Sequence, residues 1–486
     1  MAVVGRRALA GLAVVLLVGA LLRLLLVLGW QPGLMGWPDA ASYIDVSQSE
    51  LFGNELRPAG YPIFLRALHA LVPSLTVVVV LQHLLGLATA ALLFFAVARS
   101  GAPPALGLIP AAVVALGGDG IFLEHAPISE SLFMFLVAAA LYLALVAHGK
   151  QSLGWAAACG LALALAASVR VVALPLLPVF AVWFAAVLPL PLRRRLMLTA
   201  AGALGVLAVL APYYVAEHSE VGDTGLSRNG IWNVYGRVAP FADCSKFTPP
   251  KGTEDLCETT PRHARPLTYQ YTFNWYYSPA VRAFDNPHTA SPEQTRQVAA
   301  FVWAVIVNQP LDYAEEVGAG LLRYVAPESL KGYGGGPSYH DLVHNEILFN
   351  RTFQREGREV AMQHYADARS YDVDRGLVDV LRTWESGTRI QGPVFLLLAL
   401  LSLAAPFVTR GPARSAALLF TLAAWALLVT PVATVEFSAR TAVPGFGALG
   451  AAAALGAWGV AERARVSRRT RPPRRALPRP EPRPAP

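Results

Sequence analysis

Charged side chains are scarce in this sequence. They make up 15% of the 486 residues, whereas hydrophobic residues make up 55% and the mean hydropathy is +0.44. A soluble globular domain carries about 25% charged residues, so the composition excludes a soluble protein. Only four of the 40 basic residues are Lys, which with the abundance of Ala, Gly and Leu is typical of a GC-rich bacterial genome. Long apolar runs are present instead, and they predict an all-α polytopic membrane protein.

Ten apolar segments are candidates to cross a hydrocarbon core of about 30 Å. They are residues 8–28, 75–98, 103–118, 131–147, 152–168, 171–188, 196–215, 390–408, 415–433 and 441–460. If the N-terminus is cytoplasmic, every short loop rich in Arg or Lys falls on the cytoplasmic side, and the acidic loops fall outside. We therefore expect a multi-pass protein of the bacterial plasma membrane with both termini in the cytoplasm.

The hydropathy and the charge divide the chain into four parts. These are an N-terminal membrane core, 1–216, with the first external loop at 29–74; an extracytoplasmic insert of mixed helical and irregular structure, 217–388; three last membrane helices, 389–460; and a basic cytoplasmic tail, 461–486. Helical spacing is also present at 40–50, 60–72, 294–308 and 310–325. The tail is rich in Pro and Arg and is expected to be disordered. It holds most of the net charge of +8, so this charge does not point to nucleic acid.

Cysteine is rare as well, with three residues in the chain. Cys159 lies inside a predicted membrane helix and is most simply a small core residue. Cys244 and Cys257 both lie in the insert, on the side of the membrane where thiols can oxidise. We therefore predict a disulfide between them.

The first external loop places an acidic residue directly after the first apolar run, in "GWPDAASY". A carboxylate at the membrane boundary loses hydration, which is unfavourable unless it serves a cation, a proton or a substrate. Asp39 could also cap a helix that starts at Ala40. In the same loop, "RPAGYP" sets Arg57 beside a rigid turn, where its planar guanidinium group suits a phosphate. Alternatively, the Arg57 side chain could merely snorkel toward the membrane interface.

Further charged side chains fall on the same predicted face of the membrane. They are Asp119, Glu124, His125 and Glu130 in the second external loop, Arg170 at the end of the fifth helix, and Glu436 with Arg440 before the last helix. Ser129 or Glu130 could simply be a capping group of the helix that starts there. Even so, acidic and basic groups from four separate loops converge on one face.

In their order and sidedness these motifs resemble the GT-C membrane glycosyltransferases that use polyprenyl-phosphate sugars, the class with protein O-mannosyltransferases and the lipid A aminoarabinose transferase. The likeness rests on Asp39 followed by Tyr43, on "LRPAGYPIFLRAL", on the acidic residue that opens a helix in "ISESLFMF", and on the charged pair of "EFSARTAVP". It covers residues 1–215 and, more loosely, 390–460. The insert's "NVYGRVAPFADCSKF" is similar to actinobacterial members. Many relatives have a second acidic residue where this chain has Ala40.

The resemblance implies a reaction. Asp39 would act as general base on an acceptor hydroxyl, which attacks the anomeric carbon of the lipid-linked sugar with inversion. Arg57, helped by Arg170 or Arg440, would stabilise the leaving polyprenyl phosphate. The second carboxylate would come from another loop, as one of two catalytic candidates, Glu124 or Glu130.

The resemblance also implies a pocket and partners. The substrate pocket would be lined by Tyr43, Tyr61, His125 and Glu436. The acceptor would be a cell-envelope glycan, a lipid or a protein, and membrane lipids rather than nucleic acid would surround the chain. A monophosphate donor requires no metal or other cofactor, although a divalent cation could be ligated by Asp39, Glu124, His125 and Glu130.

Three other functions stay open. An envelope polysaccharide polymerase or ligase would rely on Arg and His, and His263 and His340 lie in the insert. A transporter or flippase would line a pathway with charged groups and would usually show two related halves. A structural assembly protein would leave Asp39 replaceable.

Overall fold

The fold is nearly all helical. A computed structural model describes residues 4–52, 57–221, 226, 229–261, 278–284, 290–325, 351–435 and 437–470. In these residues the one sheet is a short antiparallel pair, β1 (Trp30–Gln31) with β2 (Asp372–Val373). The prediction of an all-α polytopic membrane protein is confirmed.

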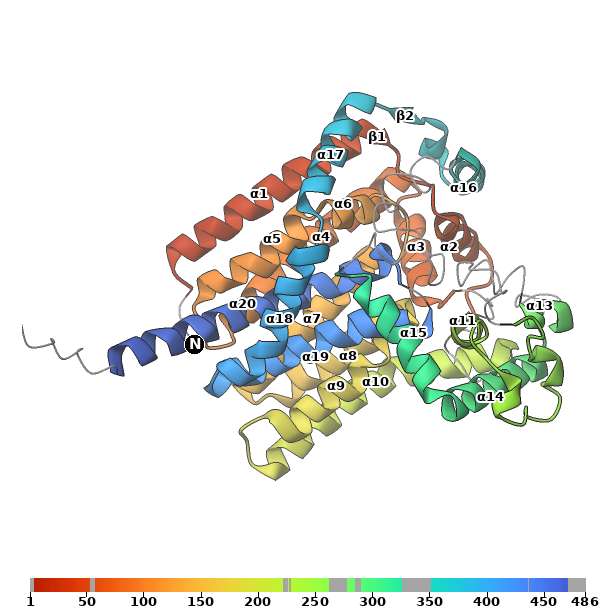
Figure 1. Cartoon of the computed structure of the whole chain (residues 1–486). Coiled ribbons are helices and arrows are strands. Elements are labelled where there is room, and N and C mark those ends of the chain that lie inside the picture. The colour runs from red at the N-terminus through yellow and green to blue at the C-terminus, as the bar shows by residue number, and fades with distance from the viewer. Residues whose placement is uncertain are drawn as a thin grey trace, which may run out of the picture.

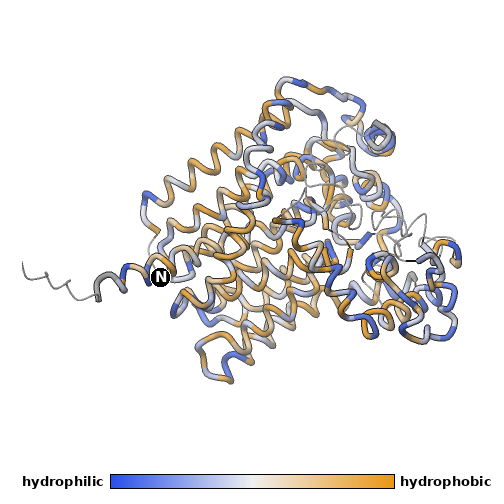
Figure 2. Tube along the Cα trace, in the orientation of Figure 1, coloured by the Kyte–Doolittle hydropathy of each residue, from blue (hydrophilic) through white to orange (hydrophobic). Residues whose placement is uncertain are grey.

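All ten predicted segments are helical and pack into one bundle (Figure 1). They correspond to α1 (Arg6–Gly29), α4 (Leu75–Ala98), α5 (Leu108–Leu116), α7 (Glu130–Lys150), α8 (Leu153–Val169), α9 (Leu176–Val182), α10 (Leu192–Val221), α18 (Gly392–Val408), α19 (Gly411–Thr434) and α20 (Ala439–Thr470). Apolar residues dominate the bundle along its whole length (Figure 2). By length and composition, six helices of the described chain can cross a membrane alone, or eight if two bent pairs each count as one span. The expected ten spans therefore appear as ten helical segments: six are long, α5 and α18 belong to the bent pairs, and α8 and α9 are short.

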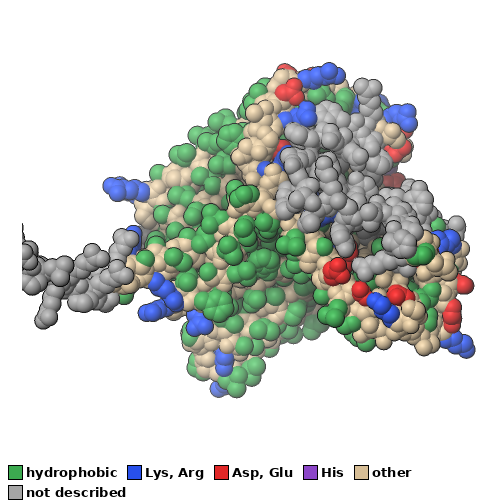
Figure 3. Space-filling model, in the orientation of Figure 1, with side chains coloured by type: hydrophobic (Ala, Val, Ile, Leu, Met, Phe, Trp, Pro, Cys, Tyr) green, Lys and Arg blue, Asp and Glu red, His purple; other side chains and the backbone are tan. Residues whose placement is uncertain are grey.

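The turns of the bundle separate by charge. At one end Arg194 donates to the carbonyl of Gln151, Arg463 donates to the carbonyl of Val408 at 3.1 Å, and Gly101 lies against Pro412. The N-terminus and the end of α20 lie on this side, away from the insert helices (Figure 1). On the face in Figure 3, Lys and Arg lie at this end, whereas acidic and basic side chains lie together at the other. The alternation matches the predicted one, and which end faces the cytoplasm stays a prediction.

The first external loop forms two helices, α2 (Pro38–Gln48) and α3 (Gly60–Leu71), as its helical spacing predicts. Trp37 is the N-cap of α2, and no side chain makes a capping hydrogen bond there. Asp39 lies inside the first turn, so the alternative that it caps a helix from Ala40 is wrong. Its carboxylate is free to serve other partners.

The first half of the insert has a small core of its own. Its helices are α11 (Asn229–Val238), α13 (Pro279–Phe284), α14 (Pro292–Asn308) and α15 (Pro310–Leu322), and Pro310 separates the last two as the sequence predicts. Trp232, Tyr235 and Phe301 are fully buried in this core. Cys244 and Cys257 are joined by a disulfide across a Cα–Cα distance of 5.9 Å.

The second half of the insert packs on the membrane body. Helix α16 (Arg351–His364) contacts α2, and α17 (Arg375–Thr388) contacts α1 and the short helix α6 (Gly118–Glu124). Asp367 accepts hydrogen bonds from the backbone N–H groups of Leu75 and Thr76, at 3.0 Å each, and from the Ser74 hydroxyl at 2.7 Å. A side chain of the insert therefore caps membrane helix α4.

The last helix is longer than the sequence analysis expected. Helix α20 runs ten residues past the predicted boundary at 460 and ends at Thr470. The residues 461–470 include Ala, Glu and Arg, which are good helix formers, so the apolar boundary does not end the helix. Residues 471–486 lie outside the described residues.

Candidate functional site

Five charged side chains meet at the end of the bundle that bears the insert. Asp39 comes from the first turn of α2 and Arg57 from the turn before α3. Glu130 opens α7, Arg170 follows the last residue of α8, and Arg440 lies in the first turn of α20. Their convergence follows from the bundle, because each belongs to a helix end on the same side.

These side chains form one chain of ion pairs. Asp39 Oδ1 is paired with Arg57 Nη2, and Asp39 Oδ2 lies 2.6 Å from Arg440 Nη1. Arg440 Nε also donates to Glu130 Oε1, which lies 2.7 Å from Arg170 Nη1. The three guanidinium groups and two carboxylates together carry a net charge of +1. The cluster therefore has one positive charge to offer an anion.

The charge state of Asp39 follows from its neighbours. Burial would raise the pKa of its carboxyl group, but the guanidinium groups of Arg57 and Arg440 outweigh it and hold the pKa well below its usual range. The Asp39 side chain is 19% exposed, so a ligand can still reach it. Asp39 is thus ionised at neutral pH, and a phosphate that draws Arg57 away would raise its pKa.

Two tyrosines support the arginines. The hydroxyl of Tyr43 lies 3.0 Å from Ser129 Oγ, and the Arg57 guanidinium lies over the Tyr43 ring, 5.3 Å from its centroid. Tyr61 packs edge-on against Tyr43 and donates to Gln82 Oε1 at 2.6 Å. Tyr43 therefore contacts the cluster directly, and Tyr61 packs against Tyr43.

Two further contacts of the cluster were not predicted. Ser129 Oγ accepts a hydrogen bond from Arg170 Nη1 at 3.0 Å, and the Trp37 ring lies 5.7 Å from the Arg440 guanidinium. Trp37 stands two residues before Asp39, so an aromatic next to the loop acid was the available signal. The sequence offers Ser129 only as a capping group, and although Ser129 is the N-cap of α7, its side chain makes no capping hydrogen bond there.

A cavity of about 440 Å³ adjoins the cluster. Asp39, Tyr43, Arg57 and Arg170 line it, whereas Glu130 and Arg440 reach it only through their ion pairs. Much of its wall is apolar, formed by Val169, Val171, Val172, Leu174, Pro175, Ile231 and Val234. Ile231 and Val234 belong to α11, so the insert closes one side. A cavity with a cationic end and an apolar wall suits an amphipathic anion.

Glu124 and His125 belong to a different cluster. Both Glu124 carboxylate oxygens accept hydrogen bonds of 2.7 Å from Arg23 of α1, and His83 Nδ1 lies 3.0 Å from Glu124 Oε2. His83 Nε2 in turn lies 3.0 Å from His125 Nδ1. A Cβ atom at Gly86 would stand only 1.9 Å from Glu124 Oε1, so this glycine makes room for the carboxylate. The structure does not bring Glu124 or His125 to Asp39.

Other predicted residues fall outside the described residues. These are Glu436 of the pocket prediction and the two insert histidines, His263 and His340. In the part of the chain that the structure describes, no group of three or more His, Cys, Asp or Glu side chains is arranged to hold a metal ion. The four side chains that could ligate a divalent cation are split between the two clusters.

A scan against protein-family models and a search of curated proteins find no match to this chain. Among solved structures it is similar to the oligosaccharyltransferase of Archaeoglobus fulgidus. The apo form has a TM-score of 0.46 and 12% identity over 95% of this chain and 51% of the other. Two further structures, one tethered to an acceptor peptide and one with an inhibitory peptide and dolichol-phosphate, have TM-scores of 0.46 and 11% identity. This chain spans about half the length of each, and similarity at this level bears on neither substrate nor residue roles.

Proposed function

We propose that this chain is an integral membrane glycosyltransferase that moves a sugar from a polyprenyl-phosphate donor to an acceptor outside the cytoplasm. The observation that carries the proposal is the cavity beside Asp39, where two arginines line the polar end and apolar side chains line the wall. The order of motifs that resembles the GT-C enzymes agrees with it. The cytoplasmic side is proposed from the basic turns at the opposite end.

The donor phosphate is assigned to Arg57 and Arg170, because these guanidinium groups reach the cavity. Each offers a planar fork of donors that matches phosphate oxygens. The donor's phosphodiester carries one negative charge, which balances the net charge of +1 on the cluster. Arg440 contacts both carboxylates and not the cavity, so its role is to hold Asp39 and Glu130 in place.

Asp39 is the general base of the proposed reaction. The acceptor hydroxyl attacks the anomeric carbon, its proton goes to Asp39, and the bond from that carbon to the phosphate oxygen breaks. The leaving polyprenyl phosphate gains one negative charge, while protonation of Asp39 removes one from the cluster. The total charge is therefore conserved, and Arg57 is released from Asp39 to stabilise the leaving phosphate. A single displacement of this kind inverts the anomeric configuration.

The polyprenyl chain has a route along the bundle. A second cavity of about 540 Å³ meets the first at Val169 and is lined mainly by apolar side chains of α3, α7, α8 and α10, including Ile63, Phe64, Leu132 and Leu165. Ile63 is 40% exposed on the outer surface of α3, so the groove is open to lipid. A prenyl chain in this groove would leave its phosphate at the arginines.

The polymerase or ligase alternative shares the lipid-linked substrate class, and it would move the chemistry to His263 or His340. A transporter or flippase is favoured by one observation, the two bent helix pairs, because discontinuous helices are common at transport sites. These alternatives separate in one experiment. Purified protein in proteoliposomes is incubated with a panel of radiolabelled polyprenyl-phosphate sugars and an envelope extract.

The proposal expects label to leave the lipid and to appear in an acceptor, with release of polyprenyl phosphate. Label that crosses the bilayer but stays on the lipid would support a flippase and contradict the transferase. Transfer that survives Asp39→Asn but is abolished by His263→Ala or His340→Ala would support the polymerase or ligase.

A further inference from the structure

The cavity beside Asp39 has one wall that the proposed transfer chemistry does not use. Asn229 and Asn233 of α11 line it, together with Thr430 and Thr434 of α19. In each pair the two residues are four apart, so their side chains lie on the same face of their helix. This wall therefore presents two amides from the insert and two hydroxyls from a membrane helix.

Two of these side chains have hydrogen-bonding capacity to spare. Within the described residues the Thr430 hydroxyl makes no hydrogen bond, whereas Thr434 Oγ1 donates to the Thr430 carbonyl at 2.8 Å. Asn229 Oδ1 is buried and has no partner in the same part of the chain. An Asn amide rotates readily about χ2, so Asn229 can turn its oxygen or its N–H group toward a ligand. Polar groups of this kind are normally paired, and a ligand in the cavity would supply the partner.

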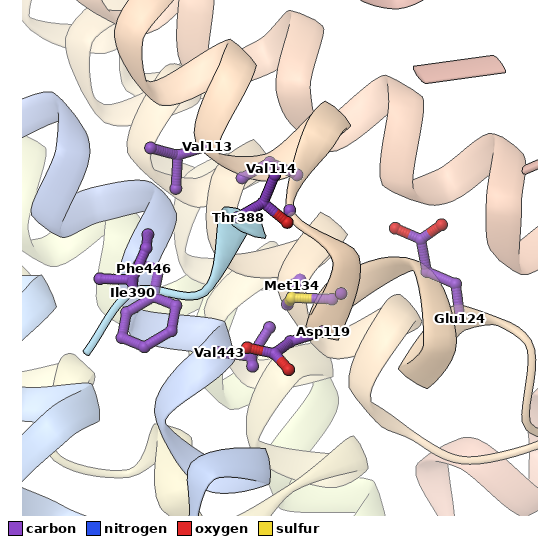
Figure 4. Close-up of a pocket in the computed structure, with 11 residues that line it drawn as sticks. Val113, Val114, Asp119, Glu124, Met134, Thr388, Ile390, Val443 and Phe446 are labelled. Atoms are coloured by element: carbon purple, nitrogen blue, oxygen red, sulfur yellow. The ribbon is translucent and has the colours of Figure 1, made fainter. Parts of the chain in front are cut away.

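The charged side chains of the cavity lie elsewhere on its surface. Among the described residues they are Asp39, Arg57 and Arg170. Asp119 and Glu124 line a separate small pocket, in which most of the other labelled side chains are apolar (Figure 4). The described lining residues of α11 and α19 are all uncharged. Their polar groups suit the hydroxyls of a ligand rather than a second anion.

The order of side chains along the cavity matches the proposed donor. Among the described residues, the groove proposed for the prenyl chain shares only Val169 with this cavity, and none of the four polar residues lines the groove. A donor in this arrangement runs from its lipid in the groove, through its phosphate at Arg57 and Arg170, to its sugar. The sugar therefore extends past the phosphate, to the part of the cavity where α11 and α19 supply uncharged polar groups.

Hydrogen bonds hold the polar wall in place. The Tyr213 hydroxyl accepts a hydrogen bond from the Ala59 N–H at 2.9 Å and donates one to the Leu226 carbonyl at 3.1 Å. Tyr213 therefore ties the turn before α3, which carries Arg57, to the chain that enters α11. Helix α11 also contacts α19 directly. The wall is thus fixed relative to the arginines, as selective binding requires.

We propose that the wall formed by Asn229, Asn233, Thr430 and Thr434 binds the hydroxyl groups of the donor's sugar, so that the insert takes part in donor selectivity. This inference rests on the proposed function and adds a sugar site to it. A site that hydrogen-bonds the hydroxyls of its substrate discriminates against analogues that lack them, because its own polar groups are then left unpaired. Different elements thus recognise the sugar and the phosphate, and a binding experiment can separate them.

The experiment measures competition with radiolabelled polyprenyl phosphate for binding to the purified full-length protein in detergent. The competitors are methyl polyprenyl phosphate, a phosphodiester without a sugar, and the polyprenyl-phosphate forms of mannose, glucose, galactose and arabinose. For the wild type we expect at least one sugar form to bind about tenfold more tightly than the methyl form, since several hydrogen bonds contribute. Thr430→Val and Asn229→Ala should each reduce this gain by about twofold to tenfold and leave binding of the methyl form unchanged.

Thr199→Val is the matched control. Thr199 is a partly buried residue of membrane helix α10, outside the cavity, and its hydroxyl donates to the Arg195 carbonyl at 3.0 Å. This variant should keep the full gain. Should Thr430→Val fail to fold, Asn229→Ala decides the matter.

The same gain in the wild type and in both variants would overturn the sugar site. An equal loss for the methyl and sugar forms would also overturn it, because the substitutions would then act on the phosphate site or on the fold. No gain for any sugar form in the wild type, with polyprenyl phosphate still bound, would reject the sugar site and leave the lipid-phosphate site intact. If the wild type binds neither polyprenyl phosphate nor any competitor, the proposed function itself fails. An unchanged gain with a raised KM for the acceptor would assign the wall to the acceptor and reject this proposal.

Discussion

The clusters around Asp39 and Glu124 use the same kinds of side chain in opposite ways. Both hold a carboxylate against a guanidinium from a distant element, Arg440 for Asp39 and Arg23 for Glu124. The side chains of Glu124 and Arg23 are 0% and 3% exposed, whereas those of Asp39 and Arg57 are 19% and 20% exposed. An ion pair at a cavity can exchange a partner for a ligand, and a sealed pair can only fix the elements that supply it. We therefore propose that the first cluster takes part in the chemistry and that the second fixes the packing of its helices.

The largest effect is expected at Asp39. Asp39→Asn keeps the size of the side chain but cannot accept the acceptor's proton, so the transfer rate should fall by about a hundredfold to ten-thousandfold. Turnover of a radiolabelled donor is measured on protein of verified fold, together with donor binding, which should persist. Near-normal turnover in this variant, with loss of turnover in Glu130→Gln, would move the base to α7.

The sealed cluster should respond in stability. Glu124→Gln leaves the buried Arg23 charge without its partner, which destabilises a protein by about 3–5 kcal/mol. Thermal unfolding should show the loss, and the transfer rate per folded molecule should stay the same. Glu316→Gln breaks a partly exposed pair with Arg237 in the insert and serves as the control with a smaller loss. A folded Glu124→Gln protein without transfer activity would erase the distinction between the clusters.

The sequence predicts the first cluster better than the second. Asp39, Arg57, Arg170 and Arg440 stand at ends of apolar runs, and in a helix bundle such ends on one side must meet. Glu124 lies in an external loop on the same side, so the same rule would place it with them. Its separation depends on the break at Gly117, which begins a new helix and turns the carboxylate toward Arg23.

The second cluster and the docking of the insert depend on tertiary contacts that no local sequence pattern indicates. Arg23 lies in the middle of an apolar run, and nothing local indicates that its partner is 101 residues away. Helix α17 packs on α1 and α6, but its sequence alone indicates only a polar amphipathic helix and not the surface on which it packs. By contrast, α2, α3, α14 and α15 follow from local spacing and Pro positions, which is why their existence is predictable.

Arg57 allows a finer comparison of charge with geometry. Arg57→Ala removes both, and charge-assisted hydrogen bonds contribute about 1.5–3 kcal/mol, so donor use should weaken by about tenfold to a hundredfold. Arg57→Lys keeps a point charge without the planar fork and should lose less. The ratio kcat/KM for the lipid donor is measured for both variants. Full activity of the two variants would show that Arg57 only snorkels at the interface.

The smallest effect is expected at Asp367, a carboxylate that binds backbone rather than arginine. Asp367→Ala removes the cap of α4 and should lower stability by about 1 kcal/mol, and Asp367→Asn should lower it less. Asp372→Ala, an exposed acid nearby, is the control. An unchanged Tm in Asp367→Ala would mean that the insert does not secure α4.

The pH dependence of this cap follows from its contacts. Burial would raise the pKa of Asp367, but the hydrogen bonds from Thr76, Ser74 and Leu75 lower it below its usual value. Its contribution is therefore complete above about pH 4 and is lost as the pH falls through the lowered pKa. The Tm difference between the wild type and Asp367→Ala should shrink in acid.

The most direct test of the comparison locates the lipid phosphate on the protein. A polyprenyl-phosphate analogue with a photoreactive group next to the phosphate is irradiated with the purified protein, and the labelled peptides are identified by mass spectrometry. We expect labels on α2, on residues 57–62 and on residues 169–175, which unlabelled polyprenyl phosphate suppresses and Arg57→Ala weakens. Labels concentrated around Arg23 and Glu124, or labels that no competitor removes, would contradict the assignment of the donor site.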